Sequence, residues 1–213
     1  GETGGGAGEG GGRRLGGTIL FAAVLCLLIV LCLPLPGWTV QTPTETVQGT
    51  VNEVLYLLTE LKETSRAGQR QWEIEQIVRR AFNYQEMAER ALGEVGAQAT
   101  AVDRRQFIRL FVQVLRDDVV DRLRDYTAAQ VAYLAEQPEE PGRVRVLIAP
   151  AGLAIDTRMA FHLIHRDGGW LVDDVSIDGA SIVATYRAQF SRILREGSFL
   201  DLMEYLKLKA PVA

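Results

Sequence analysis

The fold is decided by residues 143–181, RVRVLIAPAGLAIDTRMAFHLIHRDGGWLVDDVSIDGAS, in which apolar and polar residues alternate between short turn sequences. A period of two predicts β-strands that bury one face, and the turn sequences at 150–152 and 167–169 predict antiparallel hairpins. The pair Asp173-Asp174 interrupts the alternation, so the inward faces beside it can be assigned only by assuming a β-bulge.

Before this stretch the apolar spacing lengthens to about 3.6 residues, which predicts helices. The first helix is expected after a polar linker, 37–46, with Thr44 or Thr46 as its N-cap, and it is expected to close near Ala67-Gly68. A second helical run extends over residues 72–92 and includes Trp72 in its apolar set.

The longest helical pattern covers residues 103–126 and predicts an amphipathic helix. Its polar side is expected to carry Arg104, Arg109, Arg116, Asp117 and Arg124. A first strand from Ala129 to Tyr133 and a turn at 138–142 are predicted to follow it.

After the strands, Ser181 is predicted to cap a last long helix that ends near Gly197, and a short amphipathic segment, 199–208, follows it. The order is helices, then about four antiparallel strands, then a helix. This order predicts one α+β domain at 47–208, with the helices packed on one face of the sheet.

The N-terminal part has a different character. Residues 1–17 are rich in glycine and end in a basic flank with Arg13 and Arg14, so we expect no core there. Residues 18–36 hold an uncharged apolar run closed by two prolines, which is the layout of an export signal. The run is shorter than the roughly 20 residues that span a bilayer, which favours a signal peptide. No small-x-small cleavage sequence follows, so an uncleaved anchor stays an alternative.

Composition excludes some classes of function. The formal net charge is -4, and a scattered acidic surface argues against a nucleic-acid partner. Both cysteines, Cys26 and Cys32, lie inside the apolar run, so the remainder is expected to have no disulfide and no thiol chemistry.

Few residues suggest catalysis, and we expect no catalytic residue, no metal and no cofactor. His162 and His165 are the only histidines, and three positions apart on a strand they should point to opposite faces. Asp173-Asp174 would also diverge on a strand, and we expect one surface carboxylate and one that bonds to backbone near the turn. No glycine-rich phosphate loop is present.

The C-terminal third, DGGWLVDDVSIDGASIVATYRAQFSRILREG at residues 167–197, resembles the signature of the MlaC family, also called the toluene-tolerance family. Its specific parts are a Gly-Gly-Trp turn, an Ile-acidic-Gly-x-Ser motif at 177–181 and a Tyr-Arg-x-Gln-Phe motif at 186–190. FNYQEMAERALG at 82–93 and QFIRLFVQVL at 106–115 resemble further family motifs.

The resemblance implies a periplasmic carrier of phospholipid, or of a related lipid such as a hopanoid, with no enzymatic activity. Its implied partners are membrane lipid, an inner-membrane ABC transporter complex and an outer-membrane lipid-handling complex. The implied fold is similar to nuclear transport factors, with a curved sheet and helices around an apolar pocket. Family members are usually basic, whereas the part after residue 37 has 21 basic and 25 acidic residues.

On this basis the acyl chains are expected between the sheet and the helices. The residues expected to line the pocket are Phe107, Phe111, Val114, Leu115, Val146, Ile148, Ile155, Met159, Phe161, Leu163, Val172, Val183, Tyr186 and Phe190. Two alternatives stay open: a tethered periplasmic scaffold that binds a partner segment, and an isomerase or dehydratase with His162 or Asp174 as its base.

Overall fold

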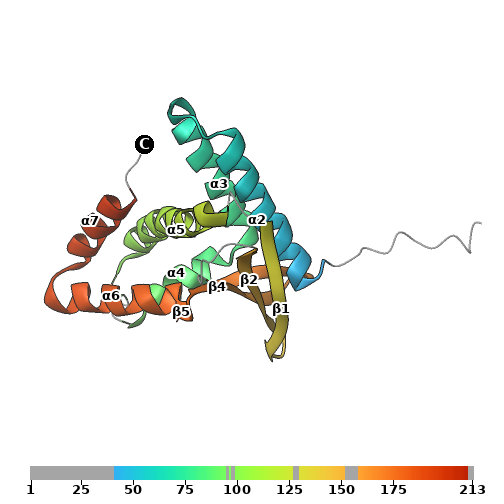
Figure 1. The fold of residues 1–213 in the computed structure, drawn as a ribbon. Coiled ribbons are helices and arrows are strands. Elements are labelled where there is room, and N and C mark those ends of the chain that lie inside the picture. Colours follow the sequence, from blue (N-terminus) through green and yellow to red (C-terminus); the bar gives the residue numbers. More distant parts are fainter. Residues whose placement is uncertain (1–40, 95, 97–98, 127–129, 152–157, 211–213) are drawn as a thin grey trace, which may run out of the picture. The chain divides into compact units, whose positions relative to one another are not determined.

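The computed structural model describes residues 41–94, 96, 99–126, 130–151 and 158–210. In this part of the chain, six α-helices and a five-stranded antiparallel sheet form an α+β fold, which confirms the predicted class (Figure 1). The expected N-terminal flank, the export signal and residues 37–40 of the linker lie outside the described residues, as does the predicted strand start at Ala129. Residues 43–46, which are expected in the linker, belong instead to the first helix.

The helices fall into two groups along the chain. Before the sheet come α2 (Pro43–Glu60), α3 (Ala67–Ala81), α4 (Tyr84–Leu92) and α5 (Ala101–Leu123), with short 3-10 turns at Thr64–Arg66 and Arg124–Tyr126. After it come α6 (Ile182–Glu196) and α7 (Phe199–Lys209). Strands of the sheet contact α2, α3, α4 and α6, whereas α5 packs against α3, α4 and α7.

The first helix begins earlier and ends earlier than predicted. Thr42, not Thr44 or Thr46, is the N-cap, and its side chain and that of Glu45 form a reciprocal capping box. Pro43 fits the first turn because the N–H that it lacks would have no partner in the helix there. The helix ends at Glu60, so residues 67–81 form a separate helix.

The second predicted helical run is also divided. The chain becomes extended at Phe82, and Asn83 N–H donates to the carbonyl of Val172 at 2.8 Å, which ties this break to strand β4. Trp72 is 60% exposed, so its place in the predicted apolar set was wrong. The next two predictions agree better. Helix α5 begins two residues before the predicted segment 103–126 and ends at Leu123, and α6 ends at Glu196 with Ser181 as its N-cap.

The sheet has the order β1-β2-β3-β4-β5, and each strand pairs antiparallel with the next. The strands are β1 (Gln130–Glu140), β2 (Arg143–Ala151), β3 (Met159–Arg166), β4 (Gly169–Ile177) and the two-residue β5 (Ala180–Ser181). The turn predicted at 138–142 is shorter, because Pro138 lies inside β1. An edge strand tolerates proline, since one side of it has no neighbouring strand.

A β-bulge lies at Asp173. His162 of β3 is opposite Asp174, but the next residue, Leu163, is opposite Val172, so Asp173 is the additional residue on β4. The bulge allows Val172 and Val175 to be buried on the same side of the sheet although they are three positions apart. This explains why the alternation in the sequence fails at the two aspartates.

Candidate functional site

An apolar layer joins the sheet to the helices. Thirteen of the fourteen residues predicted to line a pocket are described, and all belong to one contiguous hydrophobic cluster with at most 6% of each residue exposed. Ile155 lies outside the described residues. We call these thirteen residues, from Phe107 to Phe190, the apolar layer.

The strand side of the layer consists of rows that cross β2, β3 and β4. Val146 is opposite Phe161, which is opposite Val175, and Ile148 is opposite Met159. Residues that are directly opposite in antiparallel strands point to the same face, so these rows make a continuous apolar surface. Val175 was not predicted as a lining residue, because the bulge hides its inward direction from the sequence pattern.

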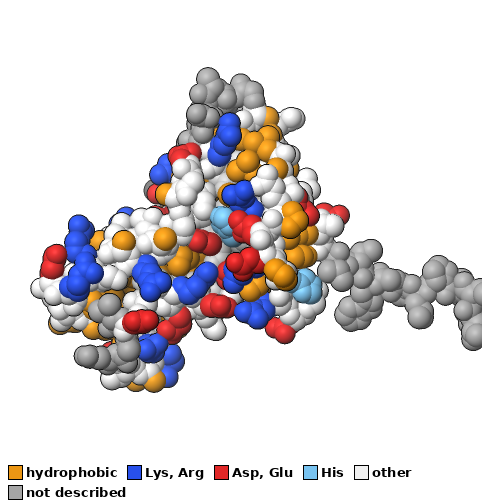
Figure 2. Space-filling model, turned by 90° about the horizontal axis from the view of Figure 1, so that it is seen from below, with side chains coloured by type: hydrophobic (Ala, Val, Ile, Leu, Met, Phe, Trp, Pro, Cys, Tyr) orange, Lys and Arg blue, Asp and Glu red, His pale blue; other side chains and the backbone are white. Residues whose placement is uncertain are grey.

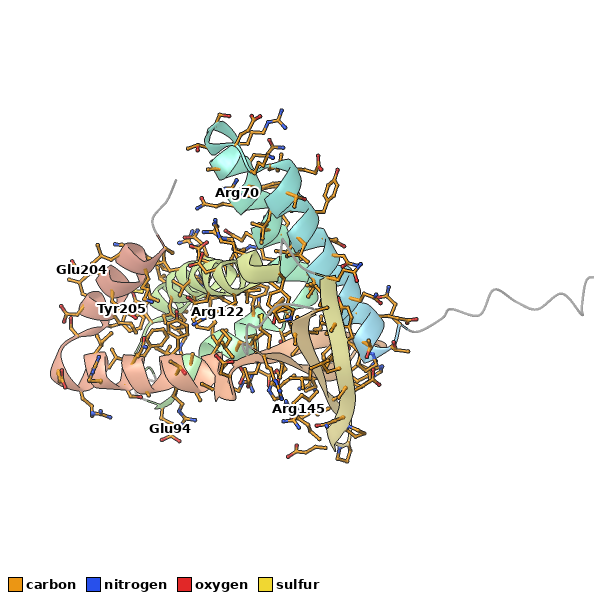
Figure 3. The ribbon with its side chains drawn as sticks, viewed as in Figure 1. Arg70, Glu94, Arg122, Arg145, Glu204 and Tyr205 are labelled. Atoms are coloured by element: carbon orange, nitrogen blue, oxygen red, sulfur yellow. The ribbon has the colours of Figure 1, made fainter. Side chains whose placement is uncertain are left out.

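The helix side of the layer contains an aromatic cluster from α5, α6 and α7. Phe107 lies edge-on to Phe190 with ring centroids 5.6 Å apart, and Phe111 lies edge-on to Tyr186 at 5.9 Å. Tyr205, which the sequence prediction did not include, contacts Phe190 at 6.4 Å and points from α7 toward the other two helices (Figure 3). Edge-to-face rings at these separations attract one another in addition to the hydrophobic effect.

Tyr186 connects the aromatic cluster to a polar side chain at the edge of the apolar layer. Its hydroxyl donates to Oδ2 of Asp118 on α5 at 2.5 Å. Burial raises the pKa of the Asp118 carboxyl, while the hydrogen bond from Tyr186 and the charge of Lys209 lower it. Burial and the contact with Asp118 also raise the pKa of the Tyr186 phenol, so this side chain is a neutral donor at physiological pH.

The main surface grooves of the described part leave the apolar layer almost untouched. Tyr186 lines a groove of about 450 Å³ between α5 and α6, and the other twelve residues of the layer line none of these grooves and are almost fully buried. The largest groove, of about 880 Å³, lies on the opposite face of the sheet and is lined by polar residues that include Arg145 and His162. The layer is therefore packed shut, and acyl chains could enter it only by separating the sheet from helices or helices from one another.

The two histidines lie apart from the layer. His162 Nδ1 is 3.0 Å from Glu139 and its Nε2 is 2.9 Å from Ser176 Oγ, all on the outer face of the sheet. His165 is exposed and packs edge-on against Trp170, with ring centroids 5.0 Å apart. His162 lies on the face of the sheet away from the apolar layer, and His165, at the exposed end of β3, is not part of the hydrophobic cluster.

Asp173 and Asp174 bind different neighbours, and the expectation that one of them is a surface carboxylate was wrong. Asp173 is 1% exposed, and it is paired with Arg143 of β2 and Arg90 of α4. Asp174 accepts hydrogen bonds from the N–H groups of Val175 and Val183 and from Ser181, so it stabilises the start of α6. They do not form a catalytic pair.

Arg116 is a buried charge that the helical pattern placed on the exposed side of α5. It is 5% exposed and bonds to Asp117 at 2.7 Å and to Glu75 of α3 at 3.3 Å. The pattern could not reveal this, because Glu75 is distant in sequence and supplies the compensating charge only in the folded chain.

Among the residues described, no helix combines the length and the apolar character needed to cross a membrane. The same residues contain no group of three or more histidine, cysteine or acidic side chains placed to hold a metal ion.

Two comparisons connect this architecture to known proteins. The family model described as MlaC protein matches residues 48–208. A solved structure, the phospholipid-binding protein from Ralstonia solanacearum in complex with a phospholipid, is similar in fold with a TM-score of 0.64 and 21% sequence identity. That similarity covers 78% of this chain and 94% of the other. No curated protein matches the chain in sequence.

Proposed function

Because the chain belongs to the MlaC family, we propose that it binds a phospholipid, or a related membrane lipid, with the acyl chains in the apolar layer. The observation that supports this most directly is the continuity of the layer, which is apolar from β2 through β4 to α5 and α6. The solved protein of the same fold contains a phospholipid.

The hydrophobic effect favours burial of acyl chains in the apolar layer, although the layer is closely packed. About a dozen methylene groups on each chain, at about 0.8 kcal/mol per buried CH₂, would contribute roughly 10 kcal/mol per chain. Separating the layer removes contacts between side chains, but contacts with the acyl chain replace them, so the dispersion energy is largely conserved. Burial in the layer would therefore keep the lipid tails out of water during transfer, as the membrane does before and after it.

We further propose that the protein carries this lipid across a periplasm between an inner-membrane ABC transporter complex and an outer-membrane complex. A carrier that makes no covalent bond can be directed only by partners that bind its loaded and empty forms with different affinities. Opening of a packed layer would give these two forms different surfaces, which supports a carrier more than a permanent structural component.

Photolabelling with a phospholipid that carries a diazirine on one acyl chain tests the location of the tails. After uptake from vesicles and irradiation, we expect labels at the inward-facing residues of 107–115, 144–148, 159–163 and 182–190, assigned residue by residue from the fragment spectra. A label confined to the outer groove around Arg145 and Leu147 would contradict the proposed location. Extraction of the purified protein followed by mass spectrometry identifies the natural lipid, and a protein that neither contains nor takes up lipid would refute the function.

A further inference from the structure

One groove connects directly to the apolar layer. It has a volume of about 450 Å³ and lies where α5, α6, the β4–β5 turn and the end of α7 meet. Its lining residues are Asp118, Asp121, Arg122, Ile177, Asp178, Ala180, Ile182, Thr185, Tyr186, Gln189 and Lys209. Arg122 extends from α5 into the region between α5 and α6 (Figure 3).

The floor of this groove is the edge of the apolar layer. Tyr186 lines the groove, and its ring contacts Phe111 and Phe190 inside the layer. Ile182 also lines the groove and belongs to the same hydrophobic cluster. A molecule with apolar tails in the layer could therefore place a polar end in this groove beside Tyr186 and Ile182.

The groove presents charges of both signs. Its carboxylates come from Asp118, Asp121 and Asp178, and its cations are Arg122 and Lys209. A phosphate would be attracted to the two cations, and an ammonium to the carboxylates. An anionic headgroup without an amine would leave the carboxylates facing a negative ligand.

The half-buried carboxylate of Asp118 is the group best placed for an ammonium. Burial raises its pKa, which indicates that its neighbours compensate the negative charge incompletely. A cation beside it would complete that compensation. Acidic and basic side chains are interspersed on the molecular face in Figure 2, so that face has no large patch of one sign.

We propose that this groove holds the headgroup of a phospholipid that carries both a phosphate and an ammonium, with Arg122 and Lys209 on the phosphate and Asp118 and Asp121 on the ammonium. This inference rests on the proposed lipid binding and adds a headgroup class to it. It also assigns Tyr186 a place between tails and headgroup, with its ring in the layer and its hydroxyl in the groove.

Competition between headgroups tests the proposal. Vesicles contain equal amounts of phosphatidylethanolamine and phosphatidylglycerol with the same acyl chains, and mass spectrometry quantifies the lipid bound after uptake. We expect a preference for phosphatidylethanolamine of about 10-fold, the scale of one charge-assisted contact. The Asp118→Asn/Asp121→Asn variant should lose the preference while uptake of phosphatidylglycerol is retained.

Two more variants test the cations and the exposed carboxylate of the groove separately. Arg122→Ser/Lys209→Ser should lower the uptake of both lipids by about 10-fold, because both carry the phosphate. Asp121→Asn alone should weaken the preference without affecting folding, since the Asp121 side chain is 73% exposed. Arg145→Ser, in the groove on the other face of the sheet, is the matched control and should behave like the unaltered protein.

The outcomes distinguish this inference from the function on which it rests. If the unaltered protein takes up both lipids equally, or if the Asp118→Asn/Asp121→Asn variant keeps the full preference, the headgroup site is refuted while lipid binding stands. If the unaltered protein takes up neither lipid, the proposed function fails, and the inference fails with it.

Discussion

Arg143 of β2 donates a hydrogen bond from Nη1 to Oδ2 of Asp173, the additional residue of the bulge in β4. Arg90 of α4 reaches the same aspartate, and Asn83 Nδ2 donates to its Oδ1 at 3.2 Å. The bulge thus turns one carboxylate out of the regular strand pattern and places it where β2, β4 and the start of α4 meet. The contact with Asp173 raises the pKa of Arg143.

The first prediction follows from this network. Asp173→Ala should lower the free energy of unfolding by about 2–4 kcal/mol, because a buried carboxylate that is paired and hydrogen-bonded is removed and its donors lose their acceptor. Denaturant unfolding of the purified domain measures the loss. Glu204→Ala, at an exposed position on α7, is the control and should change stability by less than about 0.5 kcal/mol. An equal effect of both substitutions would show that the network contributes no stability.

The aromatic cluster gives a second prediction. Phe190→Ala should destabilise the protein by about 3–5 kcal/mol, because its fully buried ring contacts Phe107, Tyr186 and Tyr205. Phe199→Ala should cost less, about 1–2 kcal/mol, since Phe199 is only partly buried and contacts the cluster from its edge. If the two losses measured by denaturant unfolding were alike, the cluster would not be the centre of the helical packing.

Phe190→Leu separates stability from lipid binding. Leucine keeps most of the apolar volume, so we expect a smaller loss of stability than with alanine and retention of lipid uptake from vesicles. Loss of uptake in a folded Phe190→Leu protein would mean that the ring itself contacts the lipid in a specific way.

Local signals in the sequence predicted much of the fold. Ser181 caps α6 through a bond to the N–H of Ala184, three residues away, and the turn at Asp167 and Gly168 depends on those residues alone. Such signals lie within a few residues of the structure that they determine. For that reason the cap of α6, this turn and the period of most segments could be identified without knowledge of distant contacts, whereas Thr42 was missed as the cap of α2.

Distant pairings were the part that the sequence did not show. Arg116 is buried because Glu75 and Asp117 surround it, and Asp173 is buried because Arg143 and Arg90 come from other elements. The residues that line a lipid cavity could not be identified from the sequence either. A residue such as Val146 is apolar and faces inward whether it packs in a core or contacts a lipid, so periodicity alone cannot distinguish the two roles.

The third prediction concerns catalysis on the outer face of the sheet. Glu139, His162 and Ser176 form a chain of hydrogen bonds that has the residue types of an acid-base-nucleophile triad. We nevertheless expect no ester hydrolysis, because Ser176 is nearly buried between β3 and β5, where backbone N–H groups bond to neighbouring strands. No oxyanion would then find free donors beside it.

Hydrolysis of p-nitrophenyl butyrate and labelling by a fluorophosphonate provide the measurement. The unaltered protein, Ser176→Ala and His162→Ala should show the same background rate, and none of them should be labelled. Labelling of Ser176 that depends on His162 would instead establish an activated serine, and the protein would then have a hydrolytic activity in addition to any carrier function.

The last prediction is the pH dependence that Asp118 confers. Its pKa in the folded protein is raised by burial, even though Tyr186 of α6 and Lys209 of α7 lower it, with Asp121 and Asp117 of α5 raising it further. Between the ordinary aspartate pKa and this raised value, the folded state binds a proton that the unfolded state does not. The contribution of Asp118 to stability therefore decreases as the pH rises through this interval and stays lower at neutral pH.

Asp118→Asn should remove this contribution, because asparagine keeps an oxygen that can accept the Tyr186 hydroxyl but does not ionise. We expect the variant to be at least as stable as the unaltered protein at pH 7, and its advantage should disappear as the pH falls below the ordinary aspartate pKa. Denaturant unfolding of both proteins across this range gives the difference directly, so the titration of all other carboxylates cancels. An advantage that grew toward acidic pH would mean that the pKa of Asp118 is lowered by folding, and the carboxylate would then already have its compensating charge within the protein.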